Sequence, residues 1–228
     1  MPKKTKAIKD SDKTKAWNRK KKPTPYRVET IAIKKTILIV CEGQTEKLYF
    51  ESFPVYGVKV EAIDLGGQSK TKLVETTVDI INGTTYTYDE VWCVFDMDYS
   101  RGAQECADFD NAINKAIQLG YKVAYSNDSF ELWFYLHYHK TEARQLRSFY
   151  YDQLSKKMNV NYEKDGKKYG FCQNIYRFLA GDKEASQSRA IKFAEELYNS
   201  QIDLPYHQQN PVTTVFMLVQ SLNENLRQ

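Results

Sequence analysis

Short apolar runs alternate with longer amphipathic segments between residues 30 and 139 of the chain. The apolar runs have the length and the β-branched or aromatic character of buried strands, and they cover residues 36–41, 58–63, 90–95 and 121–125. Segments with apolar residues at helical spacing separate these strands and cover residues 44–53, 70–81 and 105–119. This order predicts an α/β fold with a mostly parallel sheet flanked by helices, as in Rossmann-like proteins.

Helical periodicity prevails in the rest of the chain. Predicted helices cover residues 130–136, 144–158, 170–179, 183–198 and 212–226. Residues 159–169 are polar and contain a glycine, so we expect a loop there. The sequence therefore divides into a flexible basic arm at 1–29, an α/β core at 30–139 and a helical C-terminal extension at 140–228 that packs on the core.

The composition favours a soluble protein without a membrane partner. The chain has 228 residues, of which 42% are hydrophobic, and no stretch approaches the roughly 18 consecutive apolar residues of a membrane span. The N-terminus is basic and lacks the apolar segment of a secretory signal. The four cysteines lie far apart, and none forms a C-x-x-C pair. We therefore expect reduced core cysteines in a cytoplasmic protein, with neither disulfides nor a zinc site.

Positive charge is concentrated at the N-terminus. Residues 1–36 contain 13 Lys and Arg but only three acidic residues, whereas the net charge of the whole chain is +4. A Lys-rich arm, with Lys20, Lys21 and Lys22 at its centre, could bind the phosphates of a nucleic acid. It could equally be a solvated tail that only aids solubility, and composition does not separate these two hypotheses.

Acidic residues follow two of the predicted strands. Glu42 comes directly after residues 36–41, and Asp96 and Asp98 come directly after residues 90–95. Ligands of open parallel sheets collect at the carboxyl ends of the strands, and the period of an extended chain aims Asp96 and Asp98 to the same side. Carboxylates in this arrangement predict a site for Mg²⁺ (or Mn²⁺).

Each of these acids also has a simpler interpretation, as part of a turn or as a helix cap. An Asp-x-Asp after an apolar strand also occurs in phosphatases with an aspartyl nucleophile, but there it normally follows the first strand. Walker-type ATPases place acids at the same point, and the absence of any G-x-x-x-x-G-K-[ST] motif argues against them.

Further candidates lie near the same edge of the predicted sheet. Glu46 could face the same cleft as a catalytic acid, and Glu131 could complete the metal site. Each also lies in a first helical turn, where an acid favours the helix dipole, and Asp128 with Glu131 has the spacing of a capping box. The residues that could contact phosphate, or could simply form turns and solvated helix starts, are Ser69, Lys70, Arg101 and Asn127.

Four segments of the chain resemble the RloB family, whose core resembles a Toprim domain. The two most specific are the E-G-x-T-E block that begins at Glu42 and the S-N-x-x-F-E-L-W block at residues 126–133. The Asp-x-Asp at residues 96–98 and the N-P-V-T-T segment at residues 210–214 fit the same family. The similarity spans roughly residues 30 to 225.

The resemblance implies a function as well as a fold. RloB proteins are associated with bacterial restriction and abortive-infection loci, and related Toprim nucleases use a Glu and an Asp-x-Asp with divalent metal. Glu42 would match the Toprim glutamate, and Asp96 and Asp98 would match the metal-binding pair. The leading expectation is a Mg²⁺-dependent nuclease of anti-phage defence that cleaves RNA or DNA. The alternative is a non-catalytic nucleic-acid-binding or assembly component, acting with another protein of a defence operon.

Overall fold

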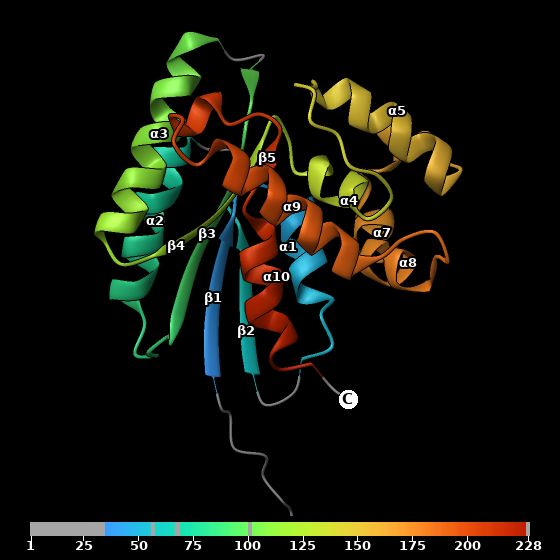
Figure 1. Cartoon of the computed structure of the whole chain (residues 1–228). Helices are drawn as coiled ribbons and strands as arrows, with labels where there is room; N and C mark the ends of the chain where they lie inside the picture. Colours follow the sequence, from blue (N-terminus) through green and yellow to red (C-terminus); the bar gives the residue numbers. More distant parts are fainter. Residues whose placement is uncertain (1–34, 56–57, 67–68, 100–101, 227–228) are drawn as a thin grey trace, which may run out of the picture. The chain divides into compact units, whose positions relative to one another are not determined.

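A five-stranded sheet forms the centre of the computed structural model, which describes residues 35–55, 58–66, 69–99 and 102–226 (Figure 1). The strands are β1 (Lys35–Cys41), β2 (Val58–Asp64), β3 (Glu90–Met97), β4 (Lys122–Asn127) and β5 (Val212–Thr213). Their order across the sheet is β2-β1-β3-β4-β5. All neighbouring pairs are parallel except β4 and β5, which are antiparallel. The predicted α/β class with a mostly parallel sheet is confirmed.

Both faces of the sheet are buried, which explains the uninterrupted apolar runs in the sequence. In β1, Ile37 and Ile39 belong to one hydrophobic cluster, whereas Leu38 and Val40 belong to another on the opposite face. The same alternation places Trp92 and Val94 of β3 on the first face. The period of two along each strand therefore divides the core into two layers of side chains.

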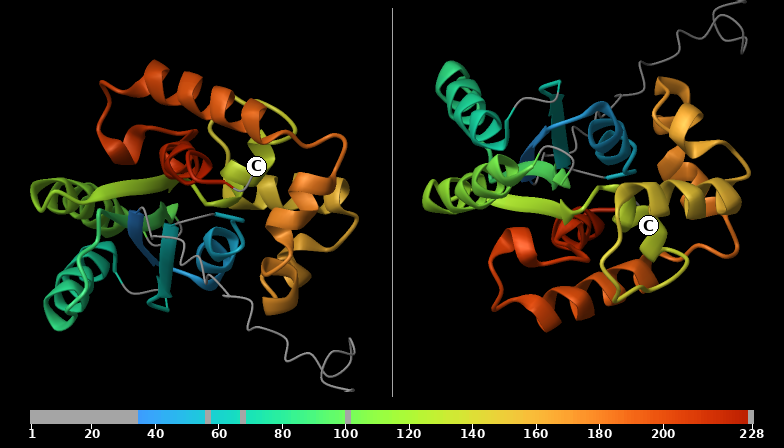
Figure 2. Two further views of the ribbon diagram at one scale, coloured as in Figure 1. Left: turned by 90° about the horizontal axis from the view of Figure 1, so that it is seen from below. Right: turned by 90° about the horizontal axis from the view of Figure 1, so that it is seen from above.

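Two helices cover one face of the sheet, and the remaining helices supply the cluster on the other (Figure 2). The first pair is α2 (Lys70–Gly83) and α3 (Ala103–Gln118). The cluster on the other face, which contains Ile37 and Ile39, includes residues from seven of the described helices. These are α1 (Gln44–Glu51), α4 (Glu131–Leu136), α5 (Arg147–Met158), α6 (Tyr162–Asp165), α8 (Ile175–Gly181), α9 (Gln187–Gln201) and α10 (Val215–Asn223). The short α7 (Tyr169–Cys172) and the 3₁₀ helix η4 (Tyr206–Gln208) complete the described chain.

The C-terminal part is helical as predicted, but three of its expected elements are wrong. The single helix predicted at 170–179 is two helices, α7 and α8. Residues 212–226 do not form one helix, because Val212 and Thr213 pair with β4 as the strand β5 before α10 begins. Thr213 and Thr214 are β-branched and follow Pro211, and their hydroxyls bond to the β4 strand, which favours an extended start. Residues 159–169 are not only a loop, because they contain α6.

Several of the predicted nucleic-acid contacts lie outside the described residues. These are the basic arm at 1–29 with its lysines at positions 20–22, and Arg101 in the loop after β3. In the part of the chain that is described, no helix combines the length and the apolar character needed to cross a bilayer.

The strand order places a topological switch point between β1 and β3. The chain leaves β1 toward β2 on one side and returns to β3 on the other side of β1. In open parallel sheets, ligands bind in the crevice outside the carboxyl ends of the strands at such a point. The sequence puts Glu42 at the end of β1 and Asp96 at the end of β3, so both acids flank this crevice.

Candidate functional site

Asp96 and Asp98 converge on one guanidinium group. The Nη2 atom of Arg147 lies 3.3 Å from Oδ1 of Asp98 and 3.9 Å from Oδ2 of Asp96. Asp96 is the penultimate residue of β3, and Asp98 is the first residue after the strand, so the two side chains share one side of an extended segment. The structure therefore brings together the two carboxylates that the sequence predicts as a pair.

Glu42 continues the line of β1 into the crevice. Its backbone N–H donates to the carbonyl oxygen of Val94 (2.9 Å), which holds the residue beside β3. Its side chain is buried, with Oε1 3.5 Å from Nζ of Lys70. The same ammonium group makes a close ion pair with Glu105. Glu42 is thus placed by the sheet and faced by a buried cation.

The other acids of the site influence the pKa of Asp96. Burial raises it well above its ordinary value, and the negative charges of Glu42 and then Glu46 raise it further. The positive charge of Arg147 acts in the opposite direction. Glu42 and Asp96 are 54 positions apart in the sequence, so only the fold can make one influence the other.

Glu46 is a buried acid with an unusual protonation behaviour. Its carboxylate turns back toward the start of α1, where a Cβ atom added at Gly43 would come within 2.9 Å of its Oε2. Burial raises the pKa of Glu46 to about 7, and the charge of Lys167 only partly offsets this rise. The side chain can therefore exchange a proton near neutral pH, which is the property of a general acid or base.

Glu131 is the first residue of α4 and is completely buried. Its Oε1 lies 2.7 Å from Nζ of Lys167, and among the described residues its Oε2 has no hydrogen-bond partner. Its charge raises the pKa values of both Glu46 and Asp96, so it belongs to the same group of acids. The capping-box interpretation is wrong, because no side chain caps α4.

Asp128 holds the start of α5 in place. Its Oδ2 accepts a hydrogen bond from the backbone N–H of Arg147 (2.9 Å), and its Oδ1 accepts one from the backbone N–H of Tyr99 (3.3 Å).

Arg147 and Lys167 are site residues that sequence reasoning missed. They lie 49 and 36 positions after Asp98 and Glu131, in a region without a recognisable motif, and no local signal marks them.

The predicted phosphate contacts are engaged within the protein. Ser69 caps α2 by accepting a hydrogen bond from the N–H of Lys72 (3.3 Å). The N–H groups of Lys70 and Thr71 donate to the carboxylate of Asp108 (2.7 and 3.2 Å), so a carboxylate of the protein already occupies the helix N-terminus. The Lys70 side chain points to Glu42 and Glu105.

Asn127 is also fully buried and bonded internally. Its side-chain amide donates to the carbonyl oxygens of Tyr206 (3.4 Å) and His207 (3.1 Å), and its carbonyl accepts from Asn210 (3.3 Å). These contacts tie the end of β4 to the segment that precedes β5. They agree with the structural interpretation of Asn127, in which the residue fixes the chain rather than binding phosphate.

The donor set fits a divalent ion in its chemistry, because carboxylates supply the hard oxygen ligands that Mg²⁺ and Mn²⁺ prefer. Acids also outnumber bases here: Glu42, Glu46, Asp96, Asp98, Glu105, Asp128 and Glu131 are faced by Lys70, Arg147 and Lys167. Within the described ranges, however, no three His, Cys, Asp or Glu side chains are positioned to hold one ion. Binding a metal would therefore require these side chains to shift.

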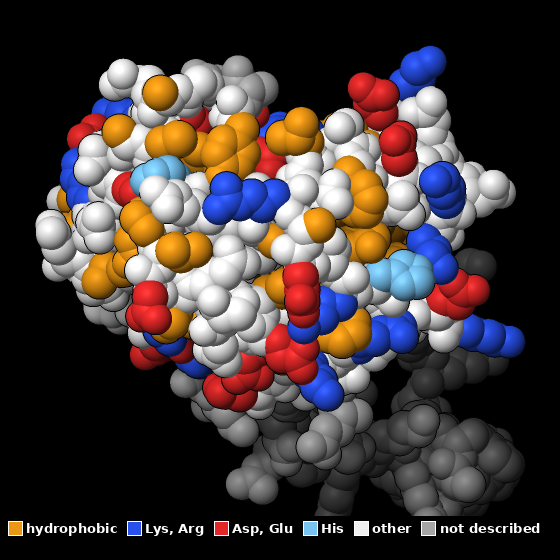
Figure 3. All heavy atoms as spheres, turned by 45° about the horizontal axis from the view of Figure 1, so that its top comes forward, with side chains coloured by type: hydrophobic (Ala, Val, Ile, Leu, Met, Phe, Trp, Pro, Cys, Tyr) orange, Lys and Arg blue, Asp and Glu red, His pale blue; other side chains and the backbone are white. Residues whose placement is uncertain are grey.

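The surface over the carboxyl ends of the strands carries both signs of charge. Figure 3, with the top of Figure 1 turned toward the viewer, shows acidic and basic side chains interspersed with apolar ones. A continuous basic surface is not visible on this face. Attraction of a nucleic acid to this face would therefore depend on individual cations at the site.

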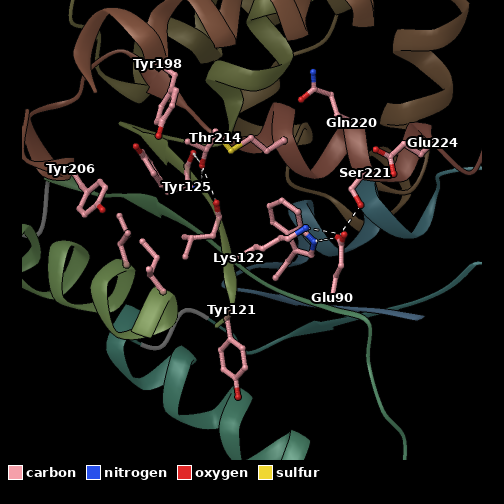
Figure 4. Close-up of a pocket in the computed structure, with 15 residues that line it drawn as sticks. Glu90, Tyr121, Lys122, Tyr125, Tyr198, Tyr206, Thr214, Gln220, Ser221 and Glu224 are labelled. Carbon is pink, nitrogen blue, oxygen red and sulfur yellow. Dashed lines mark hydrogen bonds and ion pairs between the residues drawn. The ribbon is translucent and has the colours of Figure 1, made fainter. Parts of the chain in front are cut away.

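A separate cavity of about 570 Å³ lies between α3 and α10, beside the first residues of β4, which do not pair with β5 (Figure 4). The shortness of β5 explains it, since β5 pairs only with Ser126 and Asn127. Aromatic side chains line the cavity together with Glu90 and Lys122. Burial opposes ionisation of Glu90, but hydrogen bonds from Lys122, Lys35, Trp92 and Ser221 lower its pKa to about 2. None of the predicted site residues lines this cavity.

Comparison with known proteins identifies a family. The family model of RloB-like proteins matches residues 37–222, which run from within β1 to α10 and include all of the acids described above. No curated protein and no solved structure matches the chain.

Proposed function

The chain belongs to the RloB family, and on that premise we propose that it is a divalent-metal-dependent nuclease that hydrolyses the phosphodiester bonds of RNA or DNA in bacterial anti-phage defence. Membership of the family suggests a restriction- or defence-associated role. The nuclease activity is the part that the proposal adds. We propose it because Glu42 and the Asp-x-Asp at residues 96–98 resemble the acids of Toprim nucleases.

One observation carries the proposal, namely that Asp96 and Asp98 converge on Arg147 at the carboxyl end of β3, next to Glu42 at the end of β1. The raised pKa of Asp96 agrees with this geometry, because burial is its first cause and the charges of Glu42 and Glu46 follow. Buried like charges repel, so a protein that gathers them must supply protons or cations. A divalent ion at the switch point would relieve this repulsion, and its site would lie where ligands of this fold class bind.

The residues have distinct roles in this proposal. Glu42, Asp96 and Asp98 would hold Mg²⁺ or Mn²⁺. The bound ion would supply a Lewis acid for the phosphate and a water of lowered pKa. Glu46, with a pKa of about 7, can take or give a proton beside it. Glu131 adds negative charge to the same group and lies next to Lys167.

Cleavage assays test the proposal. The full chain is incubated with single-stranded and duplex DNA, single-stranded RNA and transfer RNA, each with Mg²⁺, Mn²⁺ or EDTA. We expect cleavage of at least one substrate with metal and none with EDTA. The cleavage rate of D96A should be at least about 100-fold lower than that of the wild type. Mutation of residues that only hydrogen-bond to a metal ligand already lowers activity by about 10- to 100-fold, and loss of a ligand should cost no less. D203A alters an exposed acid and serves as the matched control.

A non-catalytic role is the second candidate, and a specific observation favours it. Three acids of the site already face a basic side chain. Glu42 lies near Lys70, Asp98 near Arg147 and Glu131 near Lys167. Such an arrangement can be stable without a metal. In this case the protein would bind nucleic acid or assemble with another protein of a defence operon. No metal would support cleavage, and D96A would leave the defence phenotype unchanged.

A further inference from the structure

Arg147 is the residue through which the helical extension reaches the acids of the sheet. It is the first residue of α5, and its side chain lies against three aspartates from the ends of β3 and β4. Nη2 contacts Asp98 (3.3 Å) and Asp96 (3.9 Å), and Nε lies 3.9 Å from Asp128. A single guanidinium therefore lies against both members of the pair that the proposed function assigns to a metal.

The backbone of Arg147 is fixed, whereas its side chain is held loosely. The backbone N–H donates to Asp128 at 2.9 Å, which anchors the start of α5. The side-chain contacts are longer than the roughly 2.7–2.9 Å of a charge-assisted hydrogen bond. Nη2 is buried, yet it has no hydrogen-bond partner among the described residues. The side chain as a whole is 30% exposed, so its other atoms reach the surface of the site.

Lys70 provides the contrast within the same site. Its side chain is 0% exposed, and it lies between Glu42 and Glu105 in the core. The two basic residues therefore differ in their surroundings, because Lys70 is fully buried between two glutamates whereas Arg147 is partly exposed and makes longer contacts.

We infer that Arg147 is a substrate-binding residue that changes partners: it neutralises Asp96 and Asp98 while they hold no metal, and it binds the phosphate backbone of the nucleic acid when they do. This inference rests on the proposed function. Two cations cannot both occupy the oxygens of Asp96 and Asp98 at contact distance without repulsion. A planar guanidinium suits the bidentate recognition of phosphate, which gives the displaced side chain a partner next to the site.

The inference predicts changes of opposite sign in one variant, which a purely structural role would not produce. R147A removes a competing positive charge, so we expect Mn²⁺ to bind about tenfold more tightly to the free protein, as judged from Coulomb's law at short range. The same variant loses a phosphate contact. Its affinity for a single-stranded oligonucleotide should fall about tenfold, and the slope of log K against log salt should decrease by about one.

Both affinities are measured on the full chain. Isothermal titration with Mn²⁺ is done without nucleic acid, and oligonucleotide binding is followed by fluorescence anisotropy with Ca²⁺ in place of the catalytic metal. R147K keeps the charge, so it should retain the wild-type salt slope and Mn²⁺ affinity. R144A removes an exposed arginine three positions earlier and should change neither quantity.

The outcomes separate this inference from the proposed function. Wild-type protein that binds Mn²⁺, together with an R147A variant that binds it no more tightly, would overturn the inference and leave the proposed function standing. Failure of every form to bind Mn²⁺ would refute both. If thermal melting shows that R147A does not fold, R147K and R147Q replace it, and R147Q must then show the tighter Mn²⁺ binding.

Discussion

Glu46 shows how strongly a single buried position can alter an acid. Burial is the main cause of its raised pKa, and the charges of Glu131 and Glu42 add to it. The folded protein therefore binds a proton at Glu46 that the unfolded chain releases. Between about pH 4.5 and about pH 7, this difference makes the free energy of unfolding fall as the pH rises.

The substitution E46Q should remove this pH dependence at its source. An amide of the same shape carries no charge, so the variant should be more stable than the wild type at pH 8, by up to about 3 kcal/mol from the size of the shift. The advantage should vanish near pH 4.5, where the wild-type side chain is also neutral. Urea unfolding at both pH values, with EDTA present, measures the effect.

The exposed acid Glu163 on α6 provides the matched control for E46Q. E163Q should change the free energy of unfolding by less than about 0.5 kcal/mol at either pH, as surface substitutions usually do. An E46Q variant that is less stable than the wild type at pH 8 would show that Glu46 is charged and well paired in the folded protein, contrary to the account.

Single residues at strand ends were the most predictable part of the site. Glu42, Asp96 and Asp98 follow apolar runs directly, and parallel strands bring their carboxyl ends to one edge. The location of Lys70 could not be predicted, because a lysine at a helix start is usually solvated and here it is buried between two glutamates. Arg147 depends on the packing of α5 near the sheet, which no local pattern encodes.

At the scale of elements, Lys70 joins three parts of the fold. It belongs to α2, and its ammonium lies between Glu42 after β1 and Glu105 on α3. The backbone at the start of α2 also donates to Asp108 on α3. These contacts make the packing of α2 and α3 depend on one buried charge.

Replacing this charge should therefore weaken the whole fold. K70M removes the buried cation that lies between Glu42 and Glu105, and we expect a loss of about 3–5 kcal/mol in the free energy of unfolding. The double variant K70M/E105Q should recover a large part of this loss, because it also removes one of the two carboxylates that contact this cation. Urea unfolding of the single and double variants measures both effects.

The control for K70M is K72M, which alters an exposed lysine two residues further along α2 that pairs with Glu75 on the surface. Its effect should stay below about 1 kcal/mol. If K70M unfolded at the same urea concentration as the wild type, the buried ion pairs would contribute nothing to stability and this part of the account would be wrong.

Periodicity predicted most elements but missed β5. The four parallel strands are apolar enough to identify, and the helices between them show a clear spacing of apolar residues. β5 has only two residues, and its pairing partner, the end of β4, lies more than 80 positions earlier. A strand this short has no period of its own, so the apolar residues of α10 dominated the prediction.

At the scale of the whole molecule, the sheet explains why the acids meet. Its strand order creates a switch point between β1 and β3, and helices on both faces keep water from the strands. The segment from α5 to α7 then brings Arg147 and Lys167 to the acids. The fold thus supplies a buried excess of negative charge together with cations that differ in how firmly they are held.

The most direct test of this account is the crystal structure of the protein soaked with Mn²⁺, in which anomalous scattering locates the metal. We expect a peak about 2.1 Å from an oxygen of Asp96, with Glu42 or Asp98 as a further ligand and the guanidinium of Arg147 displaced from both aspartates. A structure in which Arg147 still contacts Asp96 and Asp98, with no anomalous peak at any of these carboxylates, would contradict it.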